Sequence, residues 1–254
     1  MKKILVVDFG SQYTQLIARR LRELSVYSEV CPWDEIPLLN EVEGFILSGG
    51  PESSNIEGKP SIDQHIFNTK KPILGICYGM QVLAHQEEGK IINEGKREFG
   101  NAKIDIEQDS VLFKNIDQSS DVWMSHGDKV ESLPDGYNIT AVSNNSPIAA
   151  YENIAKKYFG LQFHPEVTHT ESGITIIKNF LEICGIKQNW SSDDILQQIN
   201  TFVETEVKDG EVLLALSGGV DSTVLAAVLH KTLGNKLTCV MVDHGLLRKD
   251  EALN

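Results

Sequence analysis

The sequence is short of cysteine, of positive charge and of long apolar runs, and each shortage excludes a class of protein. Its 254 residues include only 4 cysteines, scattered without paired spacing, so we expect reduced thiols in a cytoplasmic protein rather than a disulfide framework. Lysine and arginine total 23 against 36 acidic residues, which gives a formal net charge of -13. Such a balance argues against a nucleic acid partner, although single loops can still bind small anions.

Long apolar runs are missing as well. The run that follows the first methionine covers only residues 4–7 before Asp8 ends it, which is too short for a secretory signal. No other stretch approaches the roughly 20 apolar residues of a membrane-spanning helix. We therefore expect no membrane partner, and the sequence offers no candidate metal ligands.

Apolar runs and helical spacings alternate along the first part of the chain, which predicts an α/β fold with an open, mostly parallel sheet flanked by helices. Strands are expected at residues 3–8, 44–47, 72–76 and 158–163. Helices are expected at residues 12–24, 80–86 and 172–184, with Gly185 ending the last of them. Between residues 100 and 158, short strand-like runs separated by turns predict a small antiparallel addition.

A short polar segment, residues 185–192, is the expected linker and divides the chain into domains at 1–188 and 189–254. Ser191 or Ser192 can cap a helix that runs to about Lys208. A strand at 212–216, a helix at 222–233 and a strand at 237–242 follow. Because two parallel strands leave sheet edges unpaired, we expect this second α/β domain to be incomplete in the sequence.

Cys77 stands between an apolar strand and a helix in the pattern Gly-x-Cys-x-Gly, residues 75–79. This is the thiol counterpart of the nucleophile elbow, in which a sharp turn exposes the nucleophile and flanking glycines avoid clashes. The start of the helix favours the reactive thiolate. The alternative is a buried core cysteine beside turn glycines.

A second motif, His164-Pro165-Glu166, follows the strand expected at 158–163. The residue before proline is pushed towards extended geometry, and in an extended chain residues two apart point to the same side. His164 and Glu166 can therefore face one site, where the carboxylate orients the imidazole and the imidazole activates a thiol. Taken alone, the pair is more typical of a surface turn flanked by a histidine and a glutamate.

Together these motifs resemble the class I, triad-type glutamine amidotransferases, over nearly all of residues 1–185. The resemblance implies a flavodoxin-like fold in which Cys77 attacks the side-chain amide of glutamine, His164 transfers protons and Glu166 orients His164. It also implies an oxyanion hole and substrate contacts, formed by Gly50 in the loop at 48–51, by Tyr78 and by Gln81. A further segment, residues 125–128, contains His126, which is a rival base but is expected to have a positional role.

A glycine-rich loop follows the strand at 212–216: Ser217, Gly218, Gly219, Val220, Asp221 and Ser222. It is not a Walker A sequence, because no Gly-Lys-Ser/Thr follows at the right spacing. Glycines allow close approach to a phosphate, and helix-start amides and serine hydroxyls supply donors. The loop resembles the pyrophosphate-binding loop of N-type ATP pyrophosphatases, and the alternative is an ordinary strand–helix turn.

The order of the two domains, with residues 8–13 (Asp-Phe-Gly-Ser-Gln-Tyr) and 242–248 (Val-Asp-His-Gly-Leu-Leu-Arg), is similar to the glutamine-hydrolysing GMP synthase family. That resemblance implies the substrates glutamine, ATP with Mg²⁺ and XMP, no tightly bound cofactor, and a homodimer in the full-length family. The dimerisation domain, the XMP site and most of the ATP site are expected to lie outside this sequence. Other interpretations are an amidotransferase for another acceptor and a non-catalytic nucleotide-binding or regulatory fragment.

Overall fold

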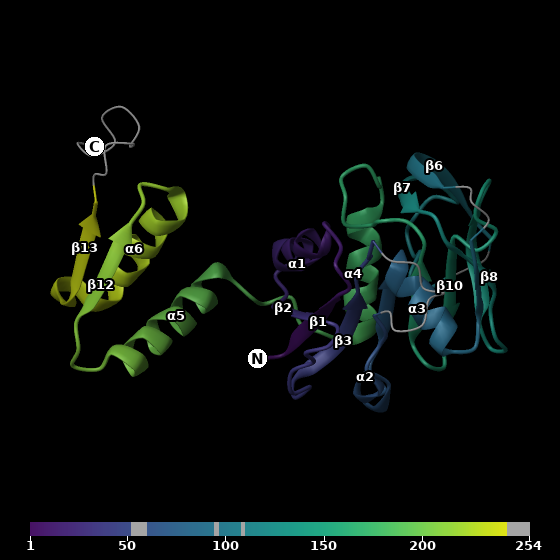
Figure 1. Cartoon of the computed structure of the whole chain (residues 1–254). Coiled ribbons are helices and arrows are strands. Elements are labelled where there is room, and N and C mark those ends of the chain that lie inside the picture. Colours follow the sequence, from purple (N-terminus) through teal and green to yellow (C-terminus); the bar gives the residue numbers. More distant parts are fainter. Residues whose placement is uncertain (52–59, 94–96, 108–109, 243–254) are drawn as a thin grey trace. The chain divides into compact units, whose positions relative to one another are not determined.

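The computed structural model describes residues 1–51, 60–93, 97–107 and 110–242 (Figure 1). The chain divides into two compact units, Met1–Trp190 and Ser191–Asn254. Of the segment at 242–248 that carries part of the family resemblance, residues 243–248 lie outside the described residues.

One sheet organises the first unit, with the strand order β2-β1-β3-β4-β11-β10-β9-β6-β7. Its first half is parallel and consists of β2 (Ser28–Pro32), β1 (Lys3–Asp8), β3 (Val42–Leu47), β4 (Ile73–Ile76) and β11 (Tyr158–Leu161). Its second half is antiparallel and consists of β10 (Ala150–Asn153), β9 (Asn138–Ser143), β6 (Glu98–Ile106) and β7 (Ser119–His126). A separate antiparallel pair joins β5 (Lys90–Ile92) to β8 (Lys129–Ser132).

Helices cover both faces of the parallel strands (Figure 1). Alternate residues of β1 enter different apolar clusters, Ile4 and Val6 on one face and Leu5 and Val7 on the other. On the first face they pack with α1 (Thr14–Glu23) and α4 (Gly173–Cys184), and on the second with α2 (Gln64–Asn68) and α3 (Tyr78–Gln86). A strand buried on both faces has a continuous apolar sequence, which is why β1 could be predicted from its composition.

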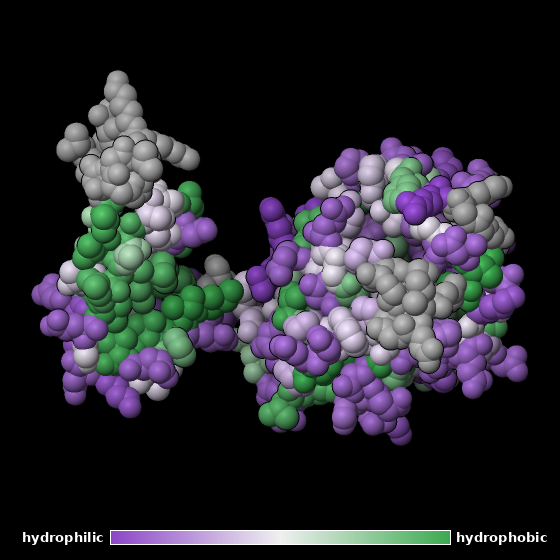
Figure 2. Space-filling model, in the orientation of Figure 1, coloured by the Kyte–Doolittle hydropathy of each residue, from purple (hydrophilic) through white to green (hydrophobic). Residues whose placement is uncertain are grey.

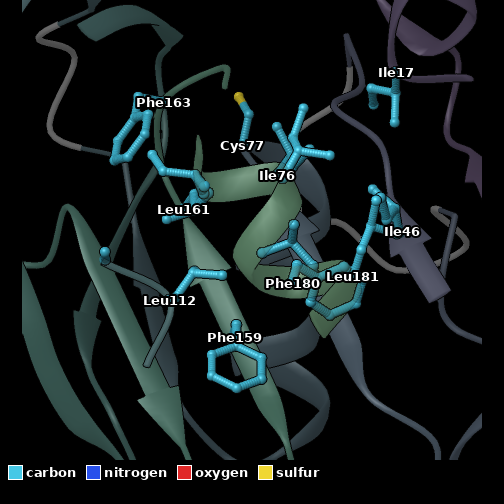
Figure 3. Packing of buried hydrophobic residues seen from close by; sticks show 14 of the residues in the cluster. Ile17, Ile46, Ile76, Cys77, Leu112, Phe159, Leu161, Phe163, Phe180 and Leu181 are labelled. Carbon is cyan, nitrogen blue, oxygen red and sulfur yellow. The ribbon is translucent and has the colours of Figure 1, made fainter. Parts of the chain in front are cut away.

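Figure 3 shows the first of these clusters, in which Phe159 and Leu161 of β11 lie with Phe180 and Leu181 of α4. Cys77 belongs to the same cluster but lies at its border. The core therefore extends directly beneath the residue that the sequence motif singles out.

The second unit contains α5 (Ser192–Val207), β12 (Val212–Leu216), α6 (Val220–Leu233), a short 3₁₀ turn (Gly234–Lys236) and β13 (Leu237–Met241). Ser191 caps α5 through a capping box with Asp194, and β12 pairs in parallel with β13. Apolar side chains of this unit lie on its surface (Figure 2), among them Leu213 at 72% and Val220 at 78% exposure. No helix within the described residues combines the length and apolarity needed to cross a membrane.

The predicted α/β fold class is confirmed, and the element bounds differ in detail. The antiparallel strands expected between residues 100 and 158 are present and continue the main sheet. Short elements with few apolar residues were not foreseen, namely β2, α2, β5 and β8. The helix α3 begins at Tyr78 rather than residue 80, and α6 begins at Val220 rather than residue 222.

Candidate active site

The turn between β4 and α3 places Cys77 at the carboxyl end of a central strand. Its backbone has φ 53° and ψ -106°, a conformation that non-glycine residues rarely adopt. The Cys77 amide donates to the Leu161 carbonyl at 2.7 Å, and the Gly79 amide donates to the Ser48 carbonyl at 3.0 Å. The surrounding structure thus holds a strained nucleophile elbow, as is common at functional sites. Cys77 as a whole is 4% exposed, and its Sγ lies 3.4 Å from the Ser125 carbonyl oxygen.

The elbow depends on Gly79 having no side chain. A Cβ there would lie 2.7 Å from the Leu47 carbonyl carbon and closer still to its oxygen. We expect Gly79→Ala to lower the free energy of unfolding by about 1–3 kcal/mol, because backbone must shift to admit the methyl group. Thermal and urea denaturation measure this change.

Gly127→Ala is the matched control, since a Cβ at Gly127 meets nothing nearer than Arg97 Cγ at 3.6 Å. Its unfolding midpoint should stay close to that of the unsubstituted protein. Equal stability of all three proteins would contradict the close packing of the elbow.

His164 and Glu166 form a buried pair beside Cys77. The Nδ1 of His164 lies 2.7 Å from Glu166 Oε1, and since a carboxylate accepts, Nδ1 carries the proton and donates it. The side chain of Cys77 acts on the ring from the same site and is among the causes that raise the pKa of His164. The Thr170 hydroxyl accepts from the Trp123 amide at 3.1 Å and donates to the His164 carbonyl at 2.6 Å. These two bonds fix the position of the His164 backbone.

The surroundings of His164 favour its charged form. Burial lowers its pKa, but the Glu166 carboxylate, the hydrogen bonds with Cys77 and Glu166, and the charge of the thiolate together raise the pKa of His164 well above its ordinary value. Tyr13 packs edge-on against the ring, with centroids 5.0 Å apart. The arrangement therefore stabilises an imidazolium next to a thiol, which is the electrostatic condition for a reactive thiolate.

The other residues predicted for this site line a cavity of about 290 Å³ in front of Cys77. Gly50, Tyr78 and Gln81 all contribute to its wall, together with Arg97 and Asp128. A Cβ on Gly50 would lie 2.9 Å from the Phe9 carbonyl oxygen and 3.2 Å from the Tyr78 ring, so only glycine fits. The structure thus brings every predicted residue of the first unit to one place.

His126 also lines the cavity, but its two ring nitrogens are engaged elsewhere. Nδ1 lies 3.0 Å from the Asp128 carbonyl oxygen and Nε2 lies 3.2 Å from Glu98 Oε2. Burial lowers the pKa of His126, against the opposing effect of Glu98. This geometry favours a positional role for His126 over that of a base acting on Cys77.

The loop at 217–222 forms a separate candidate site in the second unit. Gly218 has φ 75°, which favours glycine, and Gly219 stands at the start of α6. Ser222 Oγ accepts from the Ser217 amide at 3.3 Å, and the two hydroxyl groups lie 3.2 Å apart. The first amides of α6 lack intrahelical acceptors, and such helix starts are where proteins commonly bind phosphate groups. Asp221 lies in this first turn. Within the described residues no group of three or more potential metal-ligating side chains occurs.

Sequence reasoning missed three residues that hold the first site together: Ser48, Gln162 and Thr170. Ser48 is fully buried, and its hydroxyl accepts from the Phe9 amide at 3.0 Å. Gln162 accepts from Gln81 at 3.3 Å. The alternation that groups His164 with Glu166 includes Gln162 two residues earlier, and this was the available signal.

Comparison with protein-family models gives two matches. Residues 5–184 match the family described as glutamine amidotransferase class-I. Residues 191–253 match the family described as a PP-loop domain.

Curated proteins and solved structures point the same way. A glutamine-hydrolyzing GMP synthase from Vibrio vulnificus is 48% identical over 98% of this chain, and one from Aliivibrio fischeri is 48% identical over 99%. The chain spans 49% of the length of either relative. The solved structure of a putative GMP synthase component from Thermoplasma acidophilum covers 78% of this chain and 98% of its own, with a TM-score of 0.64 at 30% identity. A glutamine amidotransferase from Thermotoga maritima shares the fold, with a TM-score of 0.56 at 20% identity over 92% of this chain and 99% of its own.

Proposed function

The chain belongs to the class-I glutamine amidotransferase family, and from this premise we propose that it releases ammonia from glutamine with Cys77 as nucleophile. The observation that carries the proposal is the pairing of a strained elbow cysteine with a buried, charge-stabilised His164–Glu166 pair. An inert core cysteine needs neither feature.

The proposed reaction has two stages. Cys77 passes its proton to His164 and its sulfur attacks the side-chain carbonyl carbon of glutamine, while the backbone amides of Gly50 and Tyr78 stabilise the oxyanion. His164 then protonates the leaving nitrogen, so ammonia departs and a glutamyl thioester remains on Cys77. Water, deprotonated by His164, attacks the thioester, and glutamate and the free thiol are released. Glu166 keeps His164 in the orientation that both transfers require.

The use of the ammonia is proposed from the curated relatives and the second unit. We propose that the whole protein makes GMP. In this reaction ATP activates XMP with release of pyrophosphate, and ammonia then displaces AMP. The loop at 217–222 would hold the pyrophosphate part of ATP, and Asp221 is a carboxylate of the kind that suits the Mg²⁺ accompanying the nucleotide. We further propose that the domains span residues 1–188 and 189–254. The whole protein is proposed to be a homodimer in the cytoplasm.

Glutamate release from glutamine, measured on the purified chain with and without ATP, Mg²⁺ and XMP, tests the first half of this function. We expect glutamate to form at a rate above the uncatalysed background, and an electrophilic glutamine analogue to label Cys77. The exposed Cys239 provides an internal comparison for non-selective thiol labelling. Absence of both turnover and selective labelling would instead indicate a non-catalytic nucleotide-binding chain.

A further inference from the structure

Three polar groups form a buried hydrogen-bond network behind the candidate cavity. The Nε2 of Gln81 donates to the Asp128 carbonyl oxygen at 2.7 Å and to the Oε1 of Gln162 at 3.3 Å. Gln81 belongs to α3, Asp128 follows β7, and Gln162 follows β11, so the hydrogen-bond network joins three separate elements. Gln162 is 0% exposed and Gln81 is 3% exposed.

The direction of both hydrogen bonds in this network follows from the chemistry of the acceptor groups. A backbone carbonyl can only accept, so the atom of Gln81 that faces Asp128 must be its NH₂ group. The second hydrogen of that group then requires an acceptor, which makes the facing atom of Gln162 its carbonyl oxygen. Both hydrogens of the Gln81 amide are thereby occupied. Its Oε1 takes part in neither of these bonds, and Gln81 lines the cavity.

The arrangement leaves Gln162 with an unsatisfied donor. Among the described residues, its buried Nε2 has no hydrogen-bond partner. A buried donor without a partner destabilises a folded protein. Gln162 carries this cost, and its Oε1 supplies the acceptor that the buried Gln81 amide requires. The contribution of Gln162 is therefore to fix the orientation of the Gln81 amide, and not to complete a fully satisfied core.

We propose that Gln162 is a positioning residue for substrate glutamine. It holds the Gln81 amide so that Oε1 of Gln81 faces the cavity and accepts an N–H group of the bound substrate. This inference rests on the proposed glutaminase function and deepens it, because it explains how the site presents a fixed acceptor to a ligand rich in N–H donors. Gln162 itself does not touch the substrate.

Glutamine binding to the Cys77→Ala protein, followed by calorimetric titration, tests the proposal without turnover. Methionine matches the length of glutamine, so Gln162→Met removes the acceptor and the unsatisfied donor with little change of shape. We expect it to weaken glutamine binding about tenfold, the effect of losing roughly one hydrogen bond. Its melting temperature should stay close to that of the parent, because the unpaired donor of Gln162 is gone while one hydrogen of the Gln81 amide loses its acceptor.

A double-mutant cycle separates positioning from a general packing effect. If Gln162 acts through Gln81, then adding Gln162→Met to Gln81→Met should weaken binding no further. Gln86→Met is the matched control on the same helix, since Gln86 pairs with both backbone groups of Ile62, at 2.7 and 3.0 Å. That substitution should lower the melting temperature and leave glutamine affinity unchanged.

Two results overturn the inference in distinguishable ways. Equal glutamine affinity of the Cys77→Ala protein with and without Gln162→Met, or full additivity with Gln81→Met, refutes the positioning role alone. Failure of the Cys77→Ala protein to bind glutamine at all refutes the proposed function, and the inference falls with it.

Discussion

Replacement of Cys77 by alanine should abolish glutamate release from glutamine while the protein stays folded. In the proposed reaction the thiol forms the covalent intermediate, and loss of a nucleophile in such a triad lowers turnover by roughly 10⁴- to 10⁶-fold. The side chain lies at the border of the core beside the cavity, so its truncation leaves the elbow hydrogen bonds with Leu161 and Ser48 in place. Steady-state glutamate formation measures the loss, and circular dichroism with thermal denaturation reports the fold.

Cys31→Ala is the matched control, because Cys31 is another buried cysteine and lies on the edge strand β2. Burial, with the nearby charge of Glu29, raises the pKa of Cys31 to about 11, so its thiol stays protonated and unreactive at neutral pH. The control should retain full turnover. Substantial glutaminase activity in the Cys77→Ala protein would remove Cys77 from the mechanism.

Glu166→Gln should lower turnover by roughly 10³- to 10⁴-fold, although the substitution keeps the shape of the side chain. An amide can turn its NH₂ group towards Nδ1 of His164, which would hold the imidazole in the wrong tautomer. Burial lowers the pKa of His164, and the charge of the Glu166 carboxylate is the largest of the influences that raise it. Without that negative charge the imidazolium loses its proton at a lower pH, so the pKa of His164 should fall.

Nuclear magnetic resonance of the imidazole groups measures this second effect. In the unsubstituted protein His164 should titrate above its ordinary range and His126 below it, and Glu166→Gln should move the His164 midpoint downward. Glu152→Gln serves as control, because Glu152 is a buried carboxyl group that accepts from Ser110 Oγ at 2.6 Å and whose pKa burial raises. An unchanged rate and an unchanged His164 titration in the Glu166→Gln protein would show that the pair is only structural.

Several elements of the fold could be predicted because their causes are local. β1 is an apolar run buried on both faces and closed by Asp8, and α4 ends where Gly185 adopts φ 64°. β2 escaped prediction because an edge strand with the sequence Ser-Glu-Val-Cys-Pro carries too little apolar pattern. The early start of α3 has a tertiary cause, since Tyr78 and Gly79 are buried where the elbow approaches β3.

The sequence by itself determined the chemistry of the first site, because the elbow around Cys77 and the alternation of His164 with Glu166 are short-range patterns. Only the tertiary structure decided that they meet. The parallel pairing of β4 with β11 sets Ile76 beside Leu161, and the carboxyl ends of both strands then open on the same edge of the sheet. The same pairing brings Gln162 against Gln81, a contact that no local pattern encodes, because the partner of a buried polar group is chosen by the packing of distant elements.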